Sequence, residues 1–116
     1  MVGHGANRQS VIAAMMDIVD HYHVMSYNTD PTKNVARAAP AIARADSVGK
    51  TRFVHAGVET NRGIGAKVSY GDAPGKQTAA AVLADMSVIT QQLRRHPSFA
   101  GIDIHDWSGL RDLGPR

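Results

Sequence analysis

Two short segments of this chain end in residues that could do chemistry. Residues 54–60 are Val-His-Ala-Gly-Val-Glu-Thr, and residues 101–107 are Gly-Ile-Asp-Ile-His-Asp-Trp. Each has the pattern of a short buried strand that ends in polar or aromatic residues, and a helical stretch separates the two. In α/β folds, ligands meet side chains at the carboxyl ends of parallel strands. The pattern therefore predicts that Glu59 and Trp107 lie where a reaction or a ligand would be placed.

Side chains alternate along a strand, so spacing predicts which of them share a face. His55 and Glu59 point the same way on one predicted strand, and His105 and Trp107 do so on the next. If the aliphatic residues between them pack against helices, Tyr27 at the end of an earlier strand faces the same interior. We therefore expect one carboxylate, two imidazoles and two aromatic rings to converge. The candidate catalytic residue is Glu59, and the candidate substrate-binding residues are Tyr27, Asn28, His55, His105 and Trp107.

The elements that must position these residues alternate between helix and strand. The predicted bounds are helices at 9–18, 31–46 and 79–95, strands at 20–27, 51–58 and 101–106, and a long loop at 61–77. This alternation implies parallel strands joined by right-handed crossovers. The predicted fold class is α/β, with residues 1–116 forming a single partial (β/α) barrel domain of three parallel strands alternating with helices. Pro40, inside the second helix, predicts a kink or a break there.

With these motifs in order, residues 20–107 resemble the last three βα units of a glycoside-hydrolase-like TIM barrel. Residues 24–27 are similar to its sixth strand, 57–60 to its seventh and 101–107 to its eighth. The resemblance implies that Glu59 is the nucleophile of a retaining glycosidase and that Trp107 forms the floor of a sugar subsite.

The acid/base residue of such enzymes ends the fourth strand, which has no counterpart here. The chain has 116 residues, whereas a complete barrel needs roughly 200 or more. The resemblance thus implies a fragment or truncated form of a carbohydrate-active barrel, inactive alone and glycosidase-like if completed by the missing strands.

Each of these residues also has a structural interpretation. Glu59 could be a strand-end carboxylate paired with Arg62 or bound to loop N–H groups, Trp107 a plug in the core, and Tyr27 a packing residue with a hydrogen-bonded hydroxyl. The alternative function is a non-enzymatic half-barrel that self-associates or binds a ligand, since three parallel strands expose edges and faces unless they are covered. A decayed fragment without function is the third possibility.

The pair His21 and His23 lies on one strand face, a spacing compatible with metal binding. In metal-dependent hydrolases such a pair lies at the carboxyl end of its strand. Here it precedes residues 25–27 and is expected to lie deep or at the opposite end. We therefore predict no metal and no cofactor, and interpret the histidines as buried residues with satisfied ring nitrogens.

Composition limits the possible partners. The 13 Lys and Arg residues exceed the 10 Asp and Glu residues by three, but they are scattered and form no basic stripe with aromatics, which argues against nucleic-acid binding. The absence of cysteine excludes disulfides and thiolate metal sites. Residues 1–10 do not resemble a signal peptide, and no apolar run approaches the ~18 residues of a membrane span. We expect a soluble protein of undetermined location that binds carbohydrate or another small polar ligand and self-associates if expressed alone.

Overall fold

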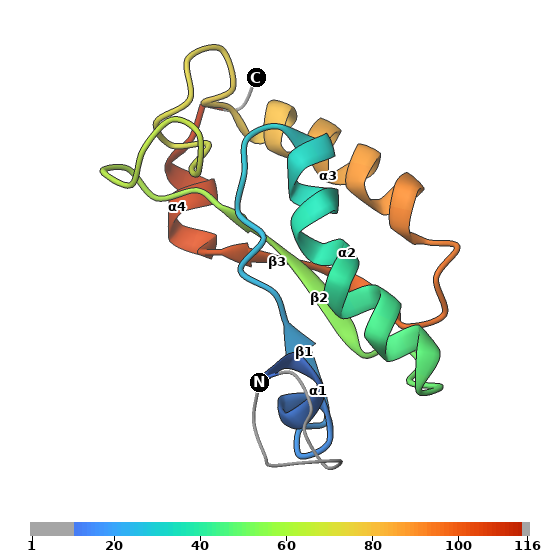
Figure 1. Cartoon of the computed structure of the whole chain (residues 1–116). Helices are drawn as coiled ribbons and strands as arrows, with labels where there is room; N and C mark the ends of the chain where they lie inside the picture. The colour runs from blue at the N-terminus through green and yellow to red at the C-terminus, as the bar shows by residue number, and fades with distance from the viewer. Residues whose placement is uncertain (1–10, 115–116) are drawn as a thin grey trace.

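The computed structural model describes residues 11–114 and consists of helices that alternate with the strands of one sheet (Figure 1). Its elements are α1 (Val11–Met16), β1 (Tyr22–His23), α2 (Pro31–Ser47), β2 (Val54–Glu59), α3 (Ala79–Leu93), β3 (Phe99–His105) and α4 (Trp107–Asp112). The strands are parallel and lie in the order β1-β2-β3. The fold class is therefore α/β with three parallel strands, as predicted. The start of the helix predicted at 9–18 lies outside the described residues.

One face of the sheet is covered by α2 and α3, which lie side by side (Figure 1). Val54, Ala56 and Val58 of the central strand β2 have no exposed surface and belong to the core cluster. Alternation puts His55, Gly57 and Glu59 on the opposite face. The candidate residues of β2 thus project from the face that these two helices leave uncovered.

Local sequence signals determine where the long helices begin. The Asp30 side chain accepts a hydrogen bond from the Thr32 N–H at 2.9 Å, and Pro31 is the first helical residue of α2. The Thr78 hydroxyl caps α3 in the same way. The predicted break at Pro40 does not occur, because α2 runs as one helix from Pro31 to Ser47. Pro40 is on the exposed side of α2, whose buried side packs in the core.

The first strand is much shorter than the predicted 20–27. Only Tyr22–His23 is strand, and the last backbone hydrogen bond from this segment to β2 is donated by the Val24 N–H to the His55 carbonyl at 2.8 Å. Beyond Val24, side chains of this segment make the hydrogen bonds to β2.

A ring of buried hydrogen bonds joins the segment after β1 to both β2 and α2. The Gly57 N–H donates to the Ser26 hydroxyl at 3.0 Å, and that hydroxyl donates to Asn34 Oδ1 at 2.9 Å. The Asn34 amide then donates to the Gly57 carbonyl at 2.8 Å. Side chains thus satisfy both the N–H and the carbonyl of Gly57. The segment after β1 therefore need not continue as a strand to pair with them.

The long loop after β2 folds back on the strand that it follows. The Asp72 carboxylate accepts hydrogen bonds from the N–H groups of Gly63, Ile64 and Gly65. The Tyr70 N–H donates to the Glu59 carbonyl at 2.9 Å. The loop therefore packs against the carboxyl end of β2. Within residues 11–114, no helix is both long enough and apolar enough to cross a membrane.

Candidate functional site

Glu59, the last residue of the central strand, is only 4% exposed. Its Oε1 accepts hydrogen bonds from the N–H groups of Thr60 at 3.1 Å and Asn61 at 2.9 Å. Its Oε2 lies 2.6 Å from Nδ1 of His105, which is opposite Glu59 in the register of β2 and β3. The N–H contacts match the structural interpretation of this carboxylate, whereas the His105 contact adds an ionisable partner. Both carboxylate oxygens are thus held in one orientation.

Tyr27 lies beside this pair. Its ring stacks with that of His105, with centroids 6.1 Å apart and planes inclined by 24°. A Cβ built on Gly57 would lie 2.6 Å from Cε1 of Tyr27, so the tyrosine ring occupies the space above this glycine. Burial raises the pKa of the Tyr27 hydroxyl, and the negative charges of Glu59 and Asp103 raise it further. At neutral pH the phenol is therefore a hydrogen-bond donor.

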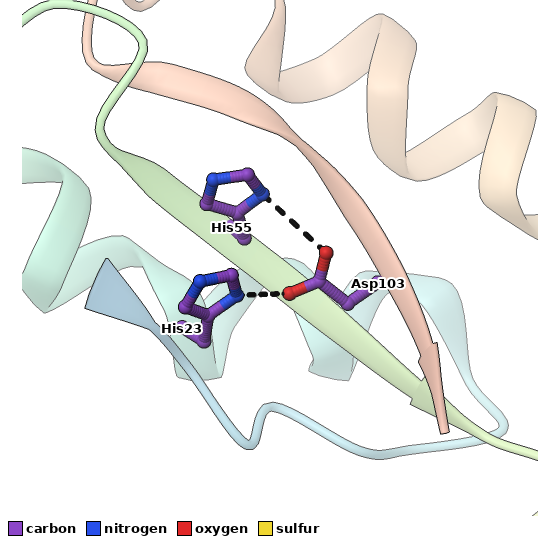
Figure 2. A group of neighbouring side chains, drawn as sticks. All are labelled: His23, His55 and Asp103. Carbon is purple, nitrogen blue, oxygen red and sulfur yellow. Dashed lines mark hydrogen bonds and ion pairs between the residues drawn. The ribbon is translucent and has the colours of Figure 1, made fainter. Parts of the chain in front are cut away.

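His55 belongs to a second group on the same face of the sheet. Figure 2 shows His23 on β1 and His55 on β2 turned toward Asp103 of β3. The rings of His23 and His55 are stacked, with centroids 4.3 Å apart. His55 precedes Glu59 by four residues, which is about 13 Å along a strand. His55 thus lies on the predicted face but beside Asp103, whereas His105 is the imidazole that contacts Glu59.

The surroundings of His55 hold it mainly in the neutral form. Burial lowers its pKa, and although the Asp103 carboxylate raises it, the nearby His23 and His21 rings lower it again. The net pKa lies below the ordinary value for histidine. An imidazole in this state offers one ring nitrogen as an acceptor.

Trp107 does not join Glu59. It is the first residue of α4 and its side chain is 70% exposed. It lines a hollow of about 510 Å³ together with Ala79, Leu83, Ile104, Leu110, Arg111 and Leu113. The alternation that predicted a shared face ends at His105, because the Asp106 side chain accepts the Gly109 N–H at 2.9 Å and begins a helix. Trp107 therefore lies beside Ile104, which belongs to the helix-covered face.

Asn28 has a structural role. It is 7% exposed, and its Oδ1 accepts the Asp30 N–H at 2.8 Å in the turn that leads into α2. The Asn28 side chain is directed to the backbone of its own turn. It supports the candidate site around Glu59 only indirectly, by fixing the segment that carries Tyr27.

Comparisons with protein-family models, with curated proteins and with solved structures find no match to this chain. Function is therefore inferred from the geometry of the side chains.

The sequence pattern does not predict that Asp103 contacts two histidines. Parity placed Asp103 on the same strand face as His105, but no register between strands was available to bring it next to His55 and His23. The sequence feature that could have indicated this contact is Gly101. It lies opposite His55 and has no side chain that would stand between His55 and Asp103.

Proposed function

We propose that Glu59 acts as the nucleophilic carboxylate of a carbohydrate-active, glycoside-hydrolase-like site. The observation that carries this proposal is the position of Glu59: a nearly buried carboxylate at the carboxyl end of the central parallel strand, with one oxygen held by backbone N–H groups and the other by His105. This is the end of the sheet at which α/β folds place their chemistry.

The neighbouring rings suit a sugar substrate. Tyr27 and the exposed side of His105 form a stacked pair beside the carboxylate. Aromatic faces pack against the C–H surfaces of a sugar, and the protonated Tyr27 hydroxyl can donate to a ring hydroxyl. In the proposed reaction, a Glu59 oxygen forms a bond to the anomeric carbon while the bond to the leaving oxygen breaks.

Glycoside hydrolysis also requires a second carboxyl group, about 5–5.5 Å away in retaining enzymes, to protonate the leaving oxygen. The contacts of Glu59 are His105 and two backbone N–H groups. We therefore propose that the acid residue is brought to the site by a segment or chain that completes the barrel.

The nucleophile can be tested without this acid. A 2,4-dinitrophenyl 2-deoxy-2-fluoroglycoside has a leaving group that departs as the phenolate and needs no proton. The electron pair of the broken C–O bond leaves with the phenolate, and a stable ester remains on the attacking carboxylate. We expect intact-mass spectrometry of the chain, incubated with both anomers of the gluco, galacto and manno reagents, to show one adduct that peptide mapping locates at Glu59.

Glu59→Gln should abolish this adduct. Asp46→Asn is the matched control, because Asp46 is also paired with a histidine, with 2.8 Å between its Oδ2 and His96 Nδ1, but lies elsewhere in the fold. Failure of the whole panel to label the wild type, or labelling of the Glu59→Gln variant, would overturn the assignment.

The second candidate function is self-association without catalysis. β3 lies at the edge of the described sheet, and large apolar side chains such as Met25 (76% exposed) and Trp107 (70% exposed) face solvent. Exposed apolar groups and sheet edges favour contact with another chain.

A further inference from the structure

The sheet register brings three metal-ligating side chains together, away from Glu59. His23 lies opposite His55 in the pairing of β1 with β2. On the other side His55 lies opposite Gly101, where a Cβ would meet no atom within 4 Å. The next side chain on that face of β3, Asp103, therefore has room to reach toward both imidazoles (Figure 2).

The donor atoms are close enough to share one ion. One potential ligand atom from each of His23, His55 and Asp103 lies within 4.8 Å of the others. Nδ1 of His23 contacts Oδ2 of Asp103, and Nδ1 of His55 is 3.4 Å from Oδ1 of the same carboxylate. Two ligands each about 2.1 Å from a tetrahedral ion lie about 3.4 Å apart. The His55–Asp103 separation is therefore close to the edge of a zinc coordination tetrahedron, whereas the His23–Asp103 contact is shorter than that edge.

A fourth residue orients His55. Its Nε2 is 3.3 Å from Nδ1 of His21, whose ring meets it edge-on with centroids 5.3 Å apart. When the His55 Nε2–H donates to His21, the lone pair of His55 Nδ1 faces the Asp103 oxygen. In that tautomer a metal ion bound to both atoms takes the place that a proton on Nδ1 takes in the other tautomer. Metal-bound histidines commonly donate their other ring N–H to a neighbouring acceptor in this way.

We propose that His23, His55 and Asp103 bind one divalent first-row transition metal ion, such as Zn²⁺, with His21 orienting His55. Two imidazoles and a carboxylate are a donor set that zinc uses in proteins. The side chains of His23 and Asp103 are 58% and 46% exposed, so an ion could enter from solvent and keep a water molecule as its fourth ligand. This site is separate from Glu59 and does not depend on the function proposed for that residue.

The test is a calorimetric titration of the untagged, chelator-treated chain with ZnCl₂. We expect one Zn²⁺ per chain. Asp103→Asn, which keeps the side-chain shape, and His55→Ala should each weaken the affinity by more than about tenfold, and His21→Ala by roughly tenfold, the effect typical of a residue that supports a ligand.

His96→Ala is the matched control, because His96 is paired with Asp46 elsewhere in the fold. It should leave the affinity unchanged. Circular dichroism verifies that each variant is folded. Co²⁺ added to the wild type supplies a measurement that needs no variant, since tetrahedral nitrogen and oxygen ligation produces intense visible absorption.

The proposal is overturned if the wild type binds no stoichiometric Zn²⁺ and gives no such Co²⁺ spectrum. It is equally overturned if folded Asp103→Asn and His55→Ala bind as tightly as the wild type, or if His96→Ala weakens binding as much as they do.

Discussion

Gly57 lies between the two candidate sites on the uncovered face of the sheet. It lies between His55 and Glu59 on β2 and opposite Asp103 on β3. The Tyr27 ring fills the space that a side chain at this position would take. Tyr27 thus lies between two groups: the histidines with Asp103 on one side, and the pair of Glu59 and His105 on the other. Burial makes the largest contribution to its raised pKa, and the charges of the two carboxylates raise the pKa further.

Gly57→Ala should therefore destabilise the protein. The new Cβ would lie 2.6 Å from Cε1 of Tyr27 and 3.0 Å from the Val24 carbonyl oxygen, so both must move. Overpacking of this kind costs about 1–3 kcal/mol in the free energy of unfolding, measurable by urea denaturation.

A double-mutant cycle identifies the cause. If the clash with the ring dominates, Gly57→Ala in a Tyr27→Ala background should cost much less than in the wild type. Equal costs in the two backgrounds would show that the backbone contact with Val24, and not the ring, is responsible.

At the scale of elements, the Asp46 carboxylate connects the end of α2 by hydrogen bonds to the residues just before β3. Its Oδ1 accepts the Ser98 N–H at 3.1 Å, and its Oδ2 lies 2.8 Å from Nδ1 of His96. Desolvation raises the pKa of Asp46, but hydrogen bonds from Ser98 and His96 outweigh it and lower the pKa below its ordinary value of 3.8. Folding therefore favours the ionised carboxylate.

This shift predicts a specific acid sensitivity. A carboxyl group whose folded pKa is depressed stabilises the fold above its unfolded pKa, and the stabilisation is lost as the pH falls through the folded pKa. Asp46→Asn should lower the thermal midpoint at pH 7, and the gap between wild type and variant should narrow as the pH falls below about 4. Asp112→Asn, at a position whose side chain is 69% exposed, serves as the control. A gap that stays constant from pH 7 to pH 2 would contradict the assignment.

The elements that sequence predicted well are those whose ends carry their own signals. α2 and α3 begin where Asp30 and Thr78 supply caps, and in β2 the apolar residues Val54, Ala56 and Val58 alternate with the residues of the other face. α2 continues past Pro40 because its buried face, including Ala41, packs against the sheet. Local helix propensity does not include this packing.

Trp107 was misplaced because of a local cap at Asp106, whereas the other failures depended on contacts between distant segments. The length of β1 depends on Ser26 and Asn34 replacing strand pairing with side-chain hydrogen bonds to β2. Parity predicted which residues of each strand point to the uncovered face. It could not predict how neighbouring strands are offset, and this offset decides that Glu59 meets His105 while His55 meets His23 and Asp103.

At the scale of the whole molecule, the sheet is asymmetric. α2 and α3 cover one face (Figure 1), and the opposite face carries every ionisable residue of both candidate sites. Beside α3 and α4 lies the hollow lined by Leu83 and Trp107, which are 55% and 70% exposed. Burying such apolar surface is worth about 25 cal/mol per Å², so contact between two chains is favoured there.

We therefore predict that the chain self-associates and that Trp107 reports it. Trp107 is the only tryptophan, so its fluorescence should shift to shorter wavelength with rising protein concentration, in step with the sedimentation coefficient. Leu83→Lys should shift the equilibrium toward monomer because it places a charge in the hollow. Val88→Lys is the matched control, since Val88 is also exposed on α3 (37%) but does not line the hollow. A species that sediments as a monomer up to high micromolar concentration would exclude self-association, and equal effects of the two lysines would place the contact elsewhere.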